Sequence, residues 1–338
     1  MSVLVWGVAS EPPIAAVLAE LSQLGADIVV VHPRQLAEVD IDVEIDATRA
    51  LRGSIVIDDR RANLNDISGA YIRPIEPELV PGLARRPVSD PLVVRARKAH
   101  DALIAFTEVA PSLTGCQVVN RLSSMGSNMS KPYQAQAILR HGFASPTTLI
   151  TDNPDEVLAF ESEFGPLIYK SISGVRSVVT EFKRATDLER LQRLRWCPVQ
   201  FQERLEGPDV RVHVIGREVY AARIEAAGVD YRYSGTQTGV DAKISPHNLS
   251  PAIGAQCVRL AADLGLAFAG IDLKLVPDGR VACFEVNPSP GFSWFEQESG
   301  LPIANAVARY LLSGEFHNTL TAVCSADARL RRAAPLIG

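Results

Sequence analysis

Residues 270–295 read GIDLKLVPDGRVACFEVNPSPGFSWF, and this stretch decides the fold. Two β-rich runs flank Pro277-Asp278-Gly279, and Asp-Gly between alternating apolar runs is the strongest short hairpin signal. With Asp278 and Gly279 as a two-residue loop, Pro277 lies opposite Arg280, and the same register places Asp272 opposite Glu285. The sequence therefore predicts a hairpin that brings two carboxylates together.

The predicted hairpin has the donors of a magnesium site. Directly opposed residues have Cβ atoms roughly 4.5 to 5.5 Å apart, and like charges at that distance are destabilising. Asn287 shares the face of Glu285, because strand side chains repeat with a period of two. Two carboxylates and an amide oxygen suit Mg²⁺, which prefers oxygen ligands and completes its shell with water and substrate phosphates.

The alternative is a solvated strand face whose acids point to water. Against it, the strand ends in Asn287-Pro-Ser-Pro-Gly-Phe292, whose prolines and glycine break the ladder directly beyond the acids. Binding and catalytic sites are commonly built beside loops at such strand ends. We therefore expect a functional site here.

Length and composition indicate a globular protein. The 338 residues are 47% hydrophobic and 22% charged, which allows two or three packed domains. A net charge of -5, without a dense basic cluster in the body, argues against nucleic acid binding. Five widely spaced cysteines indicate neither a zinc site nor a disulfide framework, so we expect a cytoplasmic protein. The first residues enter a strand-like run, so we expect no signal peptide and no membrane span.

The first 118 residues predict a small α/β domain. Strand-like runs at 3–8 and 28–31 surround a helical run at 13–24, which is a βαβ start. The first turn, Gly7 to Pro13, lacks the glycine spacing that lets a pyrophosphate approach the backbone, so we expect substrate contacts here rather than a nucleotide. Further expected elements are strands at 54–58 and 69–73 and a helix over 90–110.

Two lysines stand beside segments of small residues. Lys131 follows a polar, serine-rich loop and begins a helical run, for which Ser130 fits an N-cap. Lys170 ends an apolar strand-like run and precedes Ser171-Ile-Ser-Gly-Val-Arg-Ser177. A lysine at a strand end, before such a loop and another strand, has the outline of a flexible hairpin that covers phosphates.

This order of features resembles the ATP-grasp superfamily, and most closely its RimK-like carboxylate–amine ligases. The resemblance covers about residues 120–312, and its most specific part is Phe284 to Phe292 preceded by Gly270-Ile-Asp-Leu273. It implies an α/β fold of the α+β ATP-grasp kind, with an N-terminal Rossmann-like pre-ATP-grasp domain followed by two α+β subdomains that sandwich ATP. The implied boundaries are 1–118 for the first domain, 119–200 for the central lid subdomain, 201–325 for the C-terminal subdomain with the metal site, and 326–338 for a tail.

The resemblance also implies site residues. Its metal ligands are Asp272, Glu285 and Asn287, in agreement with the hairpin register. Lys131 and Lys170 are similar to the two lysines that contact ATP. The remaining implied nucleotide-binding residues are Gln202, Glu203 and Arg204 at the adenine hinge, where Glu203 contacts the ribose, and Asp209 after it. The implied catalytic residues are Arg211, Arg223 and Arg232.

Two positions depart from the family pattern. Arg176 stands in a loop where relatives are usually richer in glycine. Arg204 stands where the hinge usually has an aromatic residue, which leaves the cover of the adenine undefined.

The implied activity is an ATP-dependent ligation of a carboxylate to an amine through an acyl phosphate, with release of ADP and phosphate. The implied cofactors are ATP and Mg²⁺, with two ions expected and Mn²⁺ as a substitute. We expect an amino acid or peptide substrate, no nucleic acid and no membrane, and a homo-oligomer stays open. Two alternatives also stay open: a maturase that cross-links side chains of a ribosomal peptide, and a non-catalytic nucleotide-binding regulatory module.

The remaining expectations concern one histidine and a group of aromatic residues. His213 alternates with valines and is expected to be structural rather than a general base. Phe292, Trp294 and Phe295 are expected to project from a loop beside the γ-phosphate, because Pro290 and Gly291 end the strand. The alternative for Phe292 and Phe295 is that they pack beneath the final helical run, 302–312. Trp294 is expected to border the acceptor pocket.

Overall fold

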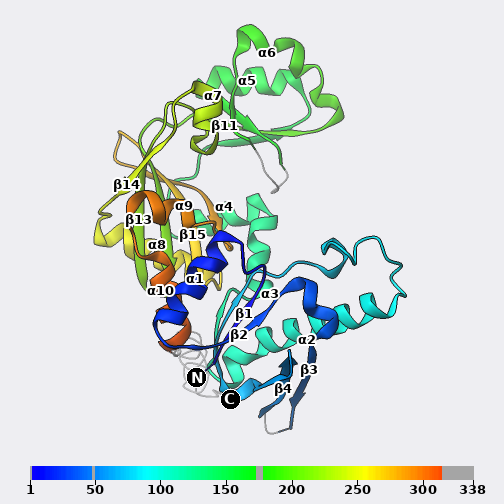
Figure 1. Cartoon of the computed structure of the whole chain (residues 1–338). Coiled ribbons are helices and arrows are strands. Elements are labelled where there is room, and N and C mark those ends of the chain that lie inside the picture. Colours follow the sequence, from blue (N-terminus) through cyan, green and yellow to red (C-terminus); the bar gives the residue numbers. More distant parts are fainter. Residues whose placement is uncertain (1, 48–49, 173–177, 314–338) are drawn as a thin grey trace, which may run out of the picture. The chain divides into compact units, whose positions relative to one another are not determined.

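The computed structural model describes residues 2–47, 50–172 and 178–313 (Figure 1). Contacts divide the chain into two units. One contains Met1–Ala9, Leu21–Val118 and the segment from Ala308 onward, and the other contains Ser10–Glu20 and Val119–Val307. Among the residues that the structure describes, no helix has both the length and the apolar character needed to cross a membrane.

The first unit is built on a sheet with the strand order β2-β1-β6-β7. Strand β1 (Ser2–Trp6) pairs in parallel with β2 (Asp27–Val31) and with β6 (Ile67–Ile72), and β7 (Gln117–Val119) completes the sheet. All five residues of β1 are buried, as expected for the central strand of a sheet that is covered on both faces. Helix α1 (Pro12–Gln23) connects β1 to β2, so the predicted βαβ start is confirmed.

A small antiparallel sheet belongs to the same unit. It consists of β3 (Asp40–Ile45), β4 (Leu51–Ile57) and β5 (Arg60–Asn63). The sequence does not predict β3, because its run DIDVEI contains three acidic residues, a type that is depleted in strands. Pairing with the apolar β4 outweighs this weak local preference.

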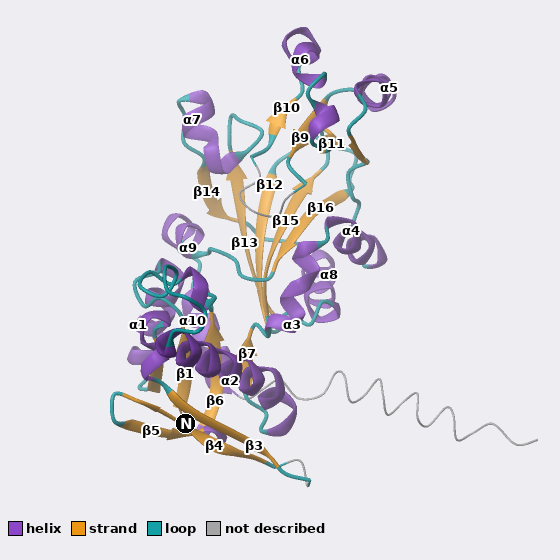
Figure 2. Ribbon diagram, turned by 90° about the vertical axis from the view of Figure 1, so that its right-hand side faces the viewer, coloured by secondary structure: helices purple, strands orange, loops and turns teal. Residues whose placement is uncertain are grey.

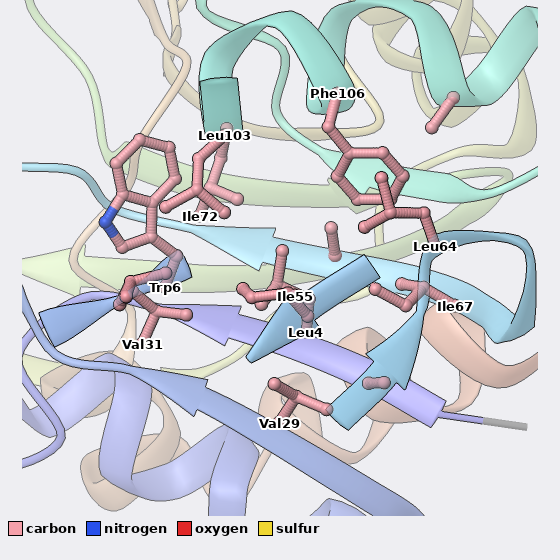
Figure 3. Packing of buried hydrophobic residues seen from close by; sticks show 14 of the residues in the cluster. Leu4, Trp6, Val29, Val31, Ile55, Leu64, Ile67, Ile72, Leu103 and Phe106 are labelled. Atoms are coloured by element: carbon pink, nitrogen blue, oxygen red, sulfur yellow. The ribbon is translucent and has the colours of Figure 1, made fainter. Parts of the chain in front are cut away.

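Helix α2 (Pro91–Leu113) covers the core of the first unit. Its N-cap Asp90 accepts a hydrogen bond from the Leu92 backbone N–H, and a proline follows directly at the first helical position. Figure 3 shows Leu103 and Phe106 of this helix in the same apolar cluster as Trp6. The helix and the strands thus share one hydrophobic core.

The second unit contains an antiparallel sheet with the strand order β14-β13-β12-β15-β16. Its strands are β12 (Asp209–Ile215), β13 (Glu218–Glu225), β14 (Lys243–Pro246), β15 (Phe268–Leu275) and β16 (Val281–Asn287). Helices α4 (Lys131–Arg140) and α8 (Pro251–Asp263) pack on one face, where Val210, Val212 and Val214 lie. Figure 2 shows α4 and α8 on one side of this sheet and α9 (Ser293–Ser299) on the other.

A second sheet in the same unit has the order β10-β9-β11-β8 and its own core, which includes Val157, Leu167 and Phe201. Its elements are β8 (Thr148–Thr151), α5 (Pro154–Phe164), β9 (Leu167–Lys170), β10 (Thr180–Glu181), α6 (Arg184–Leu191) and β11 (Val199–Glu203). The expected boundary between residues 200 and 201 falls inside β11. The short elements that remain are η1 (Pro33–Glu38), η2 (Leu64–Asp66), η3 (Pro77–Leu79), α3 (Leu122–Met125), η4 (Gly126–Met129), η5 (Leu194–Trp196), η6 (Tyr231–Tyr233), α7 (Ser234–Thr238) and α10 (Ile303–Ser313).

Candidate active site

One face of the five-stranded sheet carries a row of charged residues. Asp209, Arg211 and His213 of β12 share the face opposite the valines, because strand side chains alternate. Arg211 lies directly opposite Asp272 of β15, and Asp272 lies directly opposite Glu285 of β16. The row Arg211, Asp272 and Glu285 therefore crosses three neighbouring strands.

The hairpin reaches this register by a different route from the predicted one. The Val276 N–H donates to the Arg280 carbonyl at 2.9 Å, so the loop has three residues and Pro277 is not opposite Arg280. This register alone would put Phe284 opposite Asp272. A bulge shifts the register by one residue: Leu273 pairs with Cys283, whereas Asp272 pairs with Glu285.

The bulge shapes the site. Phe284 is the extra residue, and both Phe284 and Glu285 line the same cavity, although successive residues of a regular strand face opposite ways. The predicted facing of Asp272 and Glu285 is confirmed, whereas the predicted two-residue loop is wrong.

Arg211 is held rigidly in the row. Its Nη1 donates to Asp272 Oδ1 at 2.7 Å, and the residue is only 4% exposed. Burial has the largest single effect and by itself would lower the pKa of Arg211, but the charge and hydrogen bond of Asp272, together with Tyr231 and Glu285, raise that pKa. The guanidinium carbon lies 5.5 Å from the centre of the Phe295 ring. A Cβ on Gly270 would lie 2.3 Å from Arg211 Nη2, so only glycine at this position leaves room for the arginine.

Asp272, Glu285 and Asn287 fit a magnesium ion that is also bound by a nucleotide. Asn287 lies opposite Gly270, and its Oδ1 accepts a hydrogen bond from the Ser289 N–H at 3.0 Å, which leaves one lone pair of that oxygen. Within the described part of the chain, no three His, Cys, Asp or Glu side chains are grouped so that they could hold a metal by themselves. A cation here would therefore need phosphate oxygens and water, as Mg²⁺ usually does.

Two lysines from different elements lie within electrostatic reach of these carboxylates. Burial, followed by the charge of Lys131, lowers the pKa of Lys170 to about 8, although the charges of Glu285 and Asp272 oppose the shift. Burial also lowers the pKa of Lys131, again opposed by Glu285. Lys131 Nζ donates to the Ser171 carbonyl at 3.3 Å, so the two lysine-bearing segments meet.

A cavity of about 690 Å³ joins the two sheets of the second unit. Most predicted site residues line it: Lys170, Gln202, Arg204, Asp209, Arg211, Arg232, Asp272, Glu285 and Asn287. The structure thus collects around one cavity residues that are up to 117 positions apart, from Lys170 to Asn287. Arg176 and most of the loop after Lys170 lie outside the described residues.

Glu203 does not line this cavity. Its Oε1 accepts hydrogen bonds from the Thr147 N–H at 2.8 Å and from Thr147 Oγ1 at 3.2 Å. Gln202 and Arg204 face the cavity instead, because neighbouring residues of β11 point to opposite sides. The geometry does not support the predicted ribose contact of Glu203.

Arg223 also lies away from the cavity. It is opposite Val210, so it belongs to the face that α8 covers, and its Nε is 3.3 Å from Glu225 Oε1. This placement does not support the predicted catalytic role of Arg223.

Arg232 is held by a residue that the sequence reading missed. Asp230 is 3% exposed, and its two carboxylate oxygens accept from Arg232 Nε at 2.8 Å and from Arg232 Nη2 at 2.7 Å. Burial opposes ionisation of Asp230, but these hydrogen bonds prevail and lower its pKa. Asp230 also accepts from the Val179 N–H at 3.1 Å, so it connects Arg232 to the residue directly before β10. The Asp-x-Arg spacing was the available signal.

The aromatic residues after β16 begin a helix rather than a loop. Phe292 and Phe295 are buried, as the packing alternative expected, and Trp294 is 39% exposed and lines the cavity. Trp294 stacks on Tyr231, with 6.3 Å between ring centres and 21° between planes. The expected loop is therefore replaced by α9, which still brings Trp294 to the cavity.

His213 lies beneath the charged row. Its ring is fully buried, neither ring nitrogen has a hydrogen-bond partner among the residues that the structure describes, and burial together with Arg211 lowers its pKa well below the usual value. It packs edge-on against Phe295 at 5.3 Å between ring centres. A neutral, buried ring agrees with the structural role expected for His213.

Comparisons with known proteins agree with this site. The model of the RimK-like ATP-grasp domain matches residues 129–311, more than half of the chain. A probable alpha-L-glutamate ligase of Xanthomonas campestris pv. campestris is 30% identical over 232 residues, which are 62% of this chain and 78% of that protein.

Solved structures are similar over nearly the whole chain. The ATP-grasp ligase PsnB, complexed with a phosphomimetic variant of its minimal precursor, Mg and ADP, is 27% identical, with a TM-score of 0.71 over 93% of this chain and 98% of that one. The macrocyclase MdnC of Microcystis aeruginosa MRC, at 22% identity and a TM-score of 0.69, covers 92% of this chain and 99% of its own and shares the fold. The α/β ATP-grasp fold is confirmed, and ATP and Mg²⁺ are ligands of this class of enzyme. The chain belongs to the RimK-like ATP-grasp family and is a ligase that forms C–N bonds between a carboxylate and an amine.

Proposed function

We propose that this chain activates a carboxylate as an acyl phosphate and joins it to an amine within the cavity. The observation that carries the proposal is the row Arg211, Asp272 and Glu285 within electrostatic reach of Lys170. A carboxylate oxygen of the substrate attacks the γ-phosphorus of ATP, the bond to the bridging oxygen breaks, and ADP leaves. The amine nitrogen then attacks the acyl carbon, phosphate leaves with the electrons of the C–O bond, and the amine loses a proton.

The residue types at the site suit the positioning of the reactants and the neutralisation of phosphate charge. Phosphoryl transfer needs little covalent help from the protein, so its catalysis depends on cations held at the transferring group. Lys131 and Lys170 would bind phosphate oxygens, and Arg211 would neutralise charge that develops on the transferred group. Asp272, Glu285 and Asn287 would hold Mg²⁺, which supplies further neutralisation when it is bound. Two ions and replacement by Mn²⁺ belong to the same proposal.

The adenine end of the cavity is assigned to the hinge. Gln202 lines the cavity, its Nε2 donates to Thr148 Oγ1 at 2.9 Å, and its buried Oε1 has no partner within the described ranges. A buried acceptor without a partner costs free energy, so the exocyclic amine of adenine would satisfy it. Arg204 is engaged by Glu181 at 2.6 Å and would act here through its backbone and its aliphatic stem.

We infer that one substrate is a peptide. Structures of PsnB, which is 27% identical to this chain and covers 93% of it, hold a precursor peptide. Trp294 and Tyr231 form a partly exposed aromatic surface at the cavity, which suits an extended peptide better than a single amino acid. In this proposal residues 1–118 supply substrate contacts, and the sheet that contains β9 and β11 covers the nucleotide.

The test measures ADP release against panels of carboxylates and amines that include free amino acids and acidic or basic peptides. Stimulation by a peptide supports the proposal, stimulation by free amino acids alone supports a small-molecule ligase, and acceptor-independent hydrolysis supports the regulatory module. Lys131→Ala and Lys170→Ala are expected to weaken ATP binding by roughly 1.5 to 3 kcal/mol each. Arg223→Ala is the matched control on the opposite face of the sheet, and it should retain near-normal turnover.

A further inference from the structure

Strand β16, which carries Glu285 and Asn287, is the edge strand of its sheet. An edge strand presents backbone N–H and C=O groups that need partners. At the start of β16, Ala144 supplies them, because its N–H donates to the Val281 carbonyl and its carbonyl accepts from the Cys283 N–H, both at 2.9 Å. In the part of the chain that the structure describes, no neighbouring strand continues this pairing beside the two site residues.

A single side chain replaces that strand between the two site residues. Gln134 Nε2 donates to the Val286 carbonyl at 2.8 Å, and Gln134 Oε1 accepts from the Val286 N–H at 2.9 Å. Val286 is the residue between Glu285 and Asn287. Gln134 is 3% exposed and Val286 is fully buried, so water does not compete for these hydrogen bonds.

The same helix carries one of the two lysines. Helix α4 begins at Lys131, and Gln134 lies three residues further, which is about one turn or 4.5 Å along the axis. The paired hydrogen bonds of Gln134 therefore connect the start of α4 to the backbone of β16 at one point. That point lies about one turn from Lys131 and, along β16, between Glu285 and Asn287.

We propose that Gln134 is a positioning residue for the ligase reaction, which holds Glu285 and Asn287 in register with Lys131. The role rests on the proposed function of those three residues. The β16 backbone needs this restraint, because the bulge at Phe284 interrupts its ladder immediately before Glu285. A side chain that only fills space would not need both a donor and an acceptor, whereas Gln134 uses both.

The test compares Gln134→Met with Gln136→Met. Methionine keeps the length and apolar stem of glutamine and removes both hydrogen bonds. Gln136 is exposed on the same helix and serves as the matched control. Leu260→Ala, which removes a fully buried side chain from the core that α4 shares, is the control for loss of stability alone.

Three measurements separate positioning from stability. The first is hydrogen exchange of residues 281–287 in the metal-free protein. The second is a Mg²⁺ titration in the presence of ADP, which gives the Mg²⁺ concentration at half of the maximal rise in melting temperature. The third is the rate of ADP formation. Gln134→Met should accelerate exchange about tenfold, raise the half-saturating Mg²⁺ concentration about fivefold or more and lower kcat about tenfold. Gln136→Met should stay within about twofold in all three, and Leu260→Ala should lower the melting temperature without moving the Mg²⁺ requirement.

The proposal is overturned if Gln134→Met and Gln136→Met have the same Mg²⁺ requirement, or if Leu260→Ala raises it as much as Gln134→Met does. Glu285→Gln is measured in parallel. If Glu285→Gln impairs Mg²⁺ binding and Gln134→Met does not, only the positioning role fails. If neither variant impairs it, the proposed metal site fails and the role of Gln134 fails with it.

Discussion

Nucleotide affinity should depend on pH through Lys170. Burial, then the charge of Lys131, lowers the pKa of Lys170 to about 8 in the free protein, against an ordinary value of 10.5. Bound phosphates favour the charged amine, so above pH 8 the lysine must first gain a proton. The protonated fraction falls from about nine tenths at pH 7 to about one tenth at pH 9, which predicts about tenfold weaker binding of Mg·ADP, or about 1.4 kcal/mol.

Calorimetric titration with Mg·ADP at pH 7, 8 and 9 measures this loss, and buffers of different ionisation enthalpy should reveal uptake of nearly one proton at pH 9. Lys170→Arg stays charged throughout, so its affinity should change by less than about twofold over this range. An equal decline in Lys170→Arg would refute the assignment. The linked effect on stability has a definite sign: the folded protein binds fewer protons than the unfolded chain between pH about 8 and 10.5, so the free energy of unfolding without ligand should rise across that interval.

Three substitutions probe the rest of the site. Glu285→Gln keeps the side-chain shape and removes a charge, so Mg²⁺-dependent ADP formation should collapse while circular dichroism stays unchanged; near-normal turnover at saturating Mg²⁺ would contradict the metal assignment. In Gly270→Ala the new methyl carbon would lie 2.3 Å from Arg211 Nη2 and 2.8 Å from Pro290 Cβ. Turnover should therefore fall more than about tenfold in a folded but less stable protein. Wild-type turnover would show that Arg211 can move without consequence. Trp294→Ala should leave ATP affinity within about threefold, under roughly 0.7 kcal/mol, and lower substrate-dependent turnover more than about tenfold, whereas equal losses in ATP binding and in thermal stability would mark Trp294 as a core residue.

Local sequence signals were sufficient for most elements and for the carboxylate pair. The Asp-Gly turn and the period of two predict that Asp272 faces Glu285, and the pairing confirms it. The predicted hairpin was wrong at two points, and the two errors cancel in the register of Asp272 and Glu285. The loop has one residue more than predicted, and the bulge at Phe284 shifts the register back by one. Bulges depend on twist and on neighbouring strands, so a pattern of apolar residues does not reveal them.

The sequence was less informative about which face of its sheet each site residue occupies. Glu203 and Arg223 match family motifs by type and position, but each is one residue out of phase with the cavity wall. A helix rather than a loop after β16 was missed for a related reason, since Pro290 and Gly291 signal the end of a strand without specifying the next element of the chain.

The sequence by itself determined the family, the fold class and the chemical types gathered at the site, because these depend on periodicity and on short motifs. Only the tertiary structure decided how those groups are held. Gly270 leaves the space that Arg211 occupies, Asp230 accepts a hydrogen bond from the Val179 N–H across 51 positions of sequence, and Gln134 bonds to Val286 across 152 positions. Each of these contacts joins segments or side chains that meet only after the sheets and helices have packed, and no local propensity encodes such a meeting.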